Sequence, residues 1–78
     1  MPNLLRWKGY RFYFWSREGH EPPHIHVEKD GRYAKFWLVP IGLAKNNGFR
    51  LHELSEIRSI VRSMVVRFLE SWNDHFAL

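Results

Sequence analysis

The fold is set by one stretch of the chain, residues 24–38, which read HIHVEK-DG-RYAKFWL. Two runs rich in β-branched and aromatic residues flank Asp30-Gly31, and aspartate followed by glycine between such runs is the strongest short-range signal for a tight β-hairpin. A two-residue turn fixes the register of the strands on either side, so His24 lies opposite Trp37. The stretch therefore predicts an antiparallel hairpin.

Alternation along the two strands sorts their side chains onto opposite faces of a sheet. One face is apolar throughout and carries Ile25, Val27, Ala34, Phe36 and Leu38. The other face mixes imidazole, carboxylate, aromatic and cationic groups, namely His24, His26, Glu28, Tyr33, Lys35 and Trp37. The run 10–15 sorts in the same way, with Tyr10, Phe12 and Phe14 toward the core and Arg11, Tyr13 and Trp15 on the mixed face.

The last third of the chain has a helical period. Apolar side chains recur at steps of three and four and form one stripe, made of Leu51, Leu54, Ile57, Ile60, Val61, Met64, Val65, Phe68, Leu69 and Trp72. Glu53 stands where the second half of a capping box belongs, although Arg50 is a poor N-cap residue. We predict a helix over residues 50–75 that packs on the apolar face of the sheet.

Together these elements predict a single α+β domain over residues 1–78. Its antiparallel sheet has three to four strands within residues 4–45 and is covered on one face by the C-terminal helix. Runs 4–8 and 10–15 are separated by Gly9, which either bends one strand or turns between two. Residues 41–44 are expected to form a short edge strand, and residues 16–23 an exposed loop.

Composition limits the classes of function. The chain contains no cysteine, which excludes disulfides, thiolate metal sites and a cysteine nucleophile, and fits a reducing compartment. No apolar run is long enough for a signal peptide or a membrane span, so we expect a cytoplasmic protein without membrane contact. A net charge of +4 makes RNA a candidate partner, although surplus lysine and arginine also serve solubility.

The histidines allow three interpretations. His24 and His26 lie on the same face of one strand and could ligate a metal with Glu28, His20 or His75 as third ligand. They could instead supply the base and the acid for metal-free cleavage of an RNA phosphodiester, with Lys35 as the cation that holds the phosphate. In the third interpretation they are surface residues of the sheet, and His75 is favoured only by the negative end of the helix.

The mixed face also suggests a binding surface. Bases stack on aromatic rings while cations hold phosphates, and the candidates are Arg11, Tyr13, Trp15, Glu28, Tyr33 and Trp37. A small domain must expose some aromatic surface in any case, and a second subunit could cover this face. Arg58 and Arg62, one turn apart on the helix, could dock a partner protein or form a solvated face. We expect no bound cofactor in the metal-free interpretations.

Several segments resemble one family of small bacterial proteins, domain of unknown function 4160. They are LRWKGYRFYF at 5–14, EPPHIHV at 21–27, AKFWL at 34–38, GLAKNNGF at 42–49 and WNDHF at 72–76. Pro-Pro-His-x-His-Val is the most specific of them, and Arg50 departs from the small residue expected at the helix start. The resemblance implies a gene pairing with a second small protein, similar to a toxin–antitoxin module. It further implies an RNA-directed role, in which His24 and His26, and then Lys35 and His75, are the residues to carry over.

Overall fold

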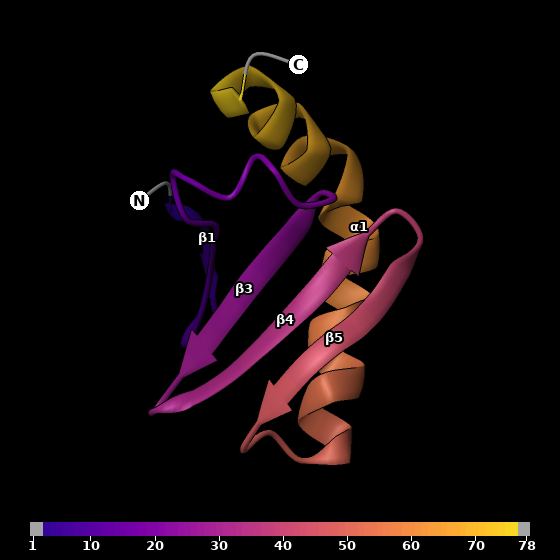
Figure 1. Cartoon of the computed structure of the whole chain (residues 1–78). Coiled ribbons are helices and arrows are strands. Elements are labelled where there is room, and N and C mark those ends of the chain that lie inside the picture. The colour runs from indigo at the N-terminus through magenta and orange to yellow at the C-terminus, as the bar shows by residue number, and fades with distance from the viewer. Residues whose placement is uncertain (1–2, 77–78) are drawn as a thin grey trace.

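The computed structural model describes residues 3–76 and consists of one sheet and one helix. Its elements are β1 (Asn3–Trp7), β2 (Tyr10–Tyr13), β3 (His24–Lys29), β4 (Arg32–Leu38), β5 (Ile41–Asn47) and α1 (Leu51–Phe76). The strands form an antiparallel sheet in the order β1-β2-β3-β4-β5. Figure 1 shows α1 as a second layer behind this sheet. The predicted α+β class is therefore confirmed. No helix within residues 3–76 combines the length and the apolarity that crossing a membrane requires.

The hairpin of β3 and β4 has the register that the Asp30-Gly31 turn predicts. His24 pairs with Trp37, and the pairing continues residue by residue to the turn. Asp30 and Gly31 both have positive φ, 49° and 78°, as a type I′ turn requires. Because the register is correct, the assignment of side chains to the two faces of this hairpin is correct as well.

The sheet has five strands, so the predicted count of three to four is wrong. Lys8 and Gly9 both adopt positive φ and turn the chain between β1 and β2, instead of bending a single strand. The predicted edge strand at residues 41–44 is also too short, because pairing continues through Asn47, which lies opposite Tyr33. A register shift beside Lys35 inserts an extra residue into β5 and lets it continue past that point.

The hydrophobic core lies between α1 and the face of the sheet that was predicted to be apolar. The buried residues of this core are Tyr10, Phe12, Ile25, Val27, Ala34, Phe36, Leu38, Phe49, Ile57, Val61 and Phe68. The predicted stripe on α1 is correct except at Leu51, which is 85% exposed. Leu51 is the first residue of α1, and the buried Phe49 fills the core at that end instead.

The helix begins with half of a capping box. The backbone N–H of Arg50 donates to Glu53 Oε1 at 3.0 Å, while Arg32 Nη1 donates to Glu53 Oε2 at 2.6 Å. Arg50 has no side-chain acceptor to return the interaction, as the sequence indicated. The Asn46 side chain instead stabilises the turn that precedes the helix. Its Oδ1 accepts the N–H of Phe49, and its Nδ2 donates to the carbonyl of the same residue.

The helix is longer than the sheet that it covers. Its 26 residues rise by about 39 Å, whereas the seven residues of β4 span about 23 Å. The last turns of α1 therefore extend past the sheet and pack on residues 14–23, the segment between β2 and β3, which we call the strap (Figure 1). Phe14 contacts Trp72 and Phe76 there, with ring centroids 5.2 and 5.5 Å away. A methyl group on Gly19 would lie only 2.5 Å from Phe76 Cδ1, so glycine permits this contact.

Candidate metal centre

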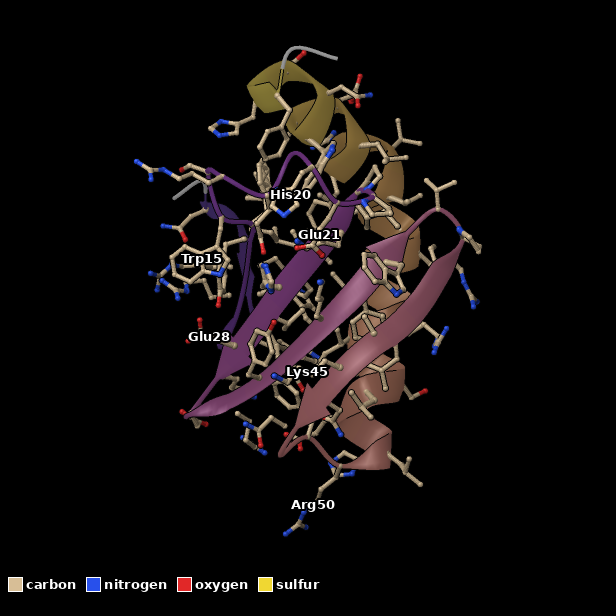
Figure 2. All side chains as sticks on the ribbon, in the orientation of Figure 1. Trp15, His20, Glu21, Glu28, Lys45 and Arg50 are labelled. Atoms are coloured by element: carbon tan, nitrogen blue, oxygen red, sulfur yellow. The ribbon has the colours of Figure 1, made fainter. Side chains whose placement is uncertain are left out.

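The strap folds back over the mixed face of the sheet and brings a carboxylate onto the histidine pair. Oε1 of Glu18 lies 2.9 Å from Nε2 of His24 and 2.8 Å from Nε2 of His26. The same oxygen accepts the backbone N–H of Trp15 at 3.0 Å. Figure 2 shows the strap residues His20 and Glu21 near the start of β3, and Trp15 farther away, beside β1. The segment predicted to be an exposed loop is therefore a cover over part of that face.

His24 is completely buried, and its two ring nitrogens have different surroundings. Nδ1 lies 2.9 Å from the carbonyl oxygen of Pro22. Because a carbonyl can only accept, Nδ1 carries a proton, and Nε2 carries a lone pair only in the neutral form of the ring. Nε2 is close to Glu18 but is not aligned for a hydrogen bond, and it has no such partner among residues 3–76. In the neutral form of the ring, a nitrogen lone pair and a carboxylate oxygen therefore face each other.

His26 is also buried, and both of its nitrogens are in contact with oxygen. Nε2 faces Glu18, and Nδ1 lies 2.8 Å from the hydroxyl of Tyr33. Burial lowers the pKa of His26, and the bond with Glu18 offsets only part of this effect, so the ring is neutral near pH 7. Burial also raises the pKa of Glu18, but its contacts with His26, with the Trp15 N–H and with His24 outweigh burial and keep the pKa low. The carboxylate therefore carries its negative charge under ordinary conditions.

These three side chains fit a single divalent transition ion. One ligand atom from each of Glu18, His24 and His26 lies within 4.8 Å of the other two. An ion bound tetrahedrally at about 2.1 Å needs ligand atoms about 3.4 Å apart, so the carboxylate has to retreat by roughly half an ångström. Both histidines already bond an oxygen through Nδ1, as metal-binding histidines usually do. Two imidazole nitrogens favour zinc or iron over calcium or magnesium.

The structure places Glu28, the third ligand suggested by the sequence, in a different network. Glu28 Oε2 accepts Arg11 Nη2 at 2.9 Å and also the hydroxyl of Tyr13. These hydrogen bonds lower the pKa of Glu28, and the bond from Tyr13 has the larger effect. Burial and the bond to Glu28 together raise the pKa of Tyr13. Tyr13 lies on the predicted face but is only 2% exposed, so the expectation that it is open to solvent is wrong.

The other histidines lie outside the group around Glu18. His20 is on the exposed surface of the strap. His75 is in the last turn of α1, where Nε2 lies 3.3 Å from the carbonyl oxygen of Ser16 and the ring packs on Phe14 and Phe76. His75 therefore ties the strap to the helix and is not brought beside His24 and His26.

The remaining predicted residues surround the group. Lys35 lies opposite His26 on β4, as predicted, and donates to Glu21 Oε1 of the strap at 2.7 Å. Trp37 lies opposite His24, with ring centroids 5.8 Å apart. Trp15 is 48% exposed and its ring lies 6.4 Å from that of His26. Of the arginines on α1, Arg62 is exposed, whereas Arg58 lies over the ring of Phe36 at 5.7 Å.

Sequence reasoning missed Glu18. It lies in a segment without strand or helix periodicity, so no pattern places its side chain over the sheet. The available signal was its position six residues before His24, in a loop that Pro22 and Pro23 direct into β3. A carboxylate shortly before a His-x-His strand is as good a candidate for a third metal ligand as Glu28, which comes two residues after His26.

A comparison with models of protein families matches residues 9–73 to a domain of unknown function, DUF4160. The match includes the strap, both histidines and the helix as far as Asn73. No curated protein and no solved structure matches the chain significantly.

Proposed function

Because the chain belongs to the domain of unknown function 4160 family, whose name assigns no activity, we propose a function from the site itself: a metal-binding domain. Glu18, His24 and His26 hold one divalent transition ion of the zinc or iron class. Three protein ligands leave a further coordination position for water or another small ligand.

One observation carries this proposal: ligand atoms of Glu18 and of the two buried histidines converge to within 4.8 Å of one another. The Pro22 carbonyl requires a proton on Nδ1, and Nε2 is fully buried beside a carboxylate without a hydrogen bond. A buried polar atom without a partner costs free energy, on the order of 1–3 kcal/mol. A cation between Glu18 Oε1 and Nε2 of a neutral His24 ring gives both atoms a partner.

The test is metal stoichiometry in protein purified without a histidine tag. Wild-type protein titrated with Co²⁺ is expected to bind one ion per chain and to develop the visible absorption of tetrahedral or five-coordinate cobalt. Elemental analysis after addition of Zn²⁺ should give the same ratio. Glu18→Gln and His24→Gln are expected to lose this binding, while His20→Gln, a change on the exposed part of the strap, keeps it.

Two results would contradict the proposal. One is the absence of stoichiometric binding by folded wild-type protein. The other is binding by His24→Gln as tight as that of the His20→Gln control. Circular dichroism of each variant confirms that a loss of binding is not a loss of fold.

A second candidate uses the same side chains without a metal. Glu18, His26 and Tyr33 form a continuous chain of contacts, 2.8 Å at each step. A carboxylate that orients an imidazole beside a hydroxyl is an arrangement that can move a proton. With Lys35 opposite His26 as phosphate cation, this supports a proposal of RNA cleavage, in keeping with the RNA-directed role that the family resemblance implies.

The tautomer of His26 separates the two candidates. Metal binding requires the proton on Nδ1, donated to Tyr33, so that Nε2 is free for the ion. Proton relay requires the proton on Nε2, donated to Glu18, so that Nδ1 accepts from Tyr33. Nitrogen-15 NMR of the histidine rings distinguishes these forms, and an RNA cleavage assay in the presence of a chelator tests the relay directly.

A further inference from the structure

The sheet face opposite α1 is divided into a covered half and an open half. The strap covers the β2–β3 half, where Tyr13, His24 and His26 are at most 3% exposed. On the other half of this face, β4 pairs with β5: Lys35 lies opposite Lys45, and Trp37 lies opposite Gly42. On these two strands Tyr33, Lys35 and Trp37 are partly exposed and Lys45 is exposed. Figure 2 shows Lys45 on the side of the sheet turned away from α1.

The open half alternates ammonium groups with aromatic rings. Lys35 Nζ lies 4.6 Å from the ring centroid of Trp37, and Lys45 Nζ lies 5.9 Å from that of Tyr33. Gly42 stands opposite Trp37, and a Cβ atom there would meet nothing within 4 Å. The space beside the indole ring is therefore open, and a flat group can approach it next to a positive charge.

One carboxylate from the strap already occupies part of this surface. Glu21 Oε1 accepts a hydrogen bond from Lys35 Nζ at 2.7 Å, and this bond lowers the pKa of Glu21. The two side chains are 31% and 17% exposed, so water and dissolved anions reach the pair. Ion pairs of this kind are weak, and a phosphate group can replace the carboxylate on Lys35.

We infer that Tyr33, Lys35, Trp37 and Lys45 form a binding site for single-stranded nucleic acid, with Glu21 as a built-in competitor. A base stacks on Trp37 beside Gly42, and the adjoining phosphates contact Lys35 and Lys45. Aromatic rings next to cations recognise single strands in this way without requiring a particular sequence. The inference does not depend on the proposed metal, because none of the four residues is a ligand in that site.

The test is a binding titration with a fluorescent oligouridine of about eight nucleotides, a length typical of single-strand sites. Binding should shift the NMR signal of the Trp37 indole N–H. Lys35→Gln and Trp37→Leu are each expected to weaken binding about tenfold or more, because stacking and phosphate contacts are lost. Glu21→Gln is expected to tighten binding severalfold. An oligothymidine of equal length shows whether the site prefers RNA or DNA.

Matched controls separate this site from general charge attraction. Arg62→Gln removes one positive charge and Glu70→Gln removes one negative charge, both from exposed positions on α1. If Lys35→Gln weakens binding no more than Arg62→Gln, or Glu21→Gln tightens it no more than Glu70→Gln, the inference is overturned. Failure of wild-type protein to bind either oligonucleotide overturns it as well.

The same titration carried out with Zn²⁺ and with a chelator keeps the two proposals apart. Glu21→Gln leaves Glu18, His24 and His26 unchanged, so its metal stoichiometry should equal that of wild type. Wild-type protein that binds the metal but neither oligonucleotide contradicts this inference alone. Wild-type protein that binds the oligonucleotide but no metal contradicts the proposed function alone.

Discussion

His24 and His26 lie two residues apart on β3, and their Nδ1 atoms contact different groups. The Pro22 carbonyl beside His24 can only accept a proton, whereas the Tyr33 hydroxyl beside His26 can donate or accept. When neutral, the first ring is therefore fixed in one tautomer, whereas the second can adopt either. An ion bound at Nε2 of both rings would select the same tautomer in His26 as in His24.

Tyr33→Phe tests this orienting contact because it keeps the aromatic ring and removes only the hydroxyl group. We expect the affinity for Zn²⁺ to fall about tenfold, in line with the loss of other contacts to metal-binding histidines. Competition with a chromophoric chelator measures the affinity. A stoichiometry that stays at one ion per chain with weaker affinity identifies an orienting role, whereas unchanged affinity contradicts it.

The turn between β3 and β4 gives a prediction about the backbone at a single residue. Gly31 has φ of 78°, and a Cβ atom there meets nothing within 4 Å, so the cost of a side chain is conformational and not steric. Gly31→Ala is expected to lower the free energy of unfolding by about 1 kcal/mol or slightly more. Urea denaturation measures the change.

Gly42→Ala is the matched control for that change. A Cβ atom at this position also meets open space, but Gly42 lies within β5 and its φ is not positive. Alanine is expected to leave the stability nearly unchanged there. Equal losses at the two positions would show that the left-handed turn conformation is not what requires glycine at position 31.

At the scale of elements, the start of α1 depends on a charged group. The backbone N–H of Arg50, burial and the guanidinium of Arg32 act on Glu53, and their net effect lowers its pKa below the ordinary value of 4.5. A carboxyl group with a lowered pKa stabilises the folded state above its unfolded pKa. This contribution is lost as the pH falls below about 4.5 and through the folded pKa.

We therefore expect Glu53→Gln to be less stable than wild type at pH 7 and to approach wild type as the pH falls through the folded pKa of Glu53. Urea denaturation of both proteins at several pH values measures the difference. The variant keeps a side-chain acceptor for the Arg50 N–H, so the comparison reports mainly on the charge. A difference that does not shrink in acid would contradict a role for that charge.

The elements in which apolar side chains recur at a regular spacing could be predicted from the sequence. The segments without such a spacing could not. The hairpin followed from Asp30-Gly31 and from alternation, and α1 followed from its apolar stripe. The separation of β1 from β2 depended on whether Gly9 bends or turns the chain, and composition does not decide this. The strap has no period, so neither its return over the sheet nor the approach of Glu18 to the histidines could be derived.

At the scale of the whole molecule, an ion at the proposed centre would connect the strap to the sheet. A ligand that binds only the folded state raises stability in proportion to the logarithm of its concentration, by about 4 kcal/mol at a thousand times its Kd. We expect Zn²⁺ to raise the melting temperature of wild type and a chelator to reverse the rise. Glu18→Gln should melt at the same temperature with either addition, and a Zn²⁺-dependent rise in that variant would contradict the assignment.

The strand order also determines how the chain can fold. Every strand pairs with its immediate neighbour in sequence, so the sheet assembles by closing short loops in succession, which favours rapid folding. The strap makes contacts of two kinds: Glu18 reaches His26 only eight residues on, whereas Phe14 packs on Trp72 of α1. The approach of Glu18 to the histidines can therefore form as soon as β3 is in place, while the packing of Phe14 waits for the helix. An ion at the proposed centre could then bind before the helix docks, and metal binding would act on an early step of folding.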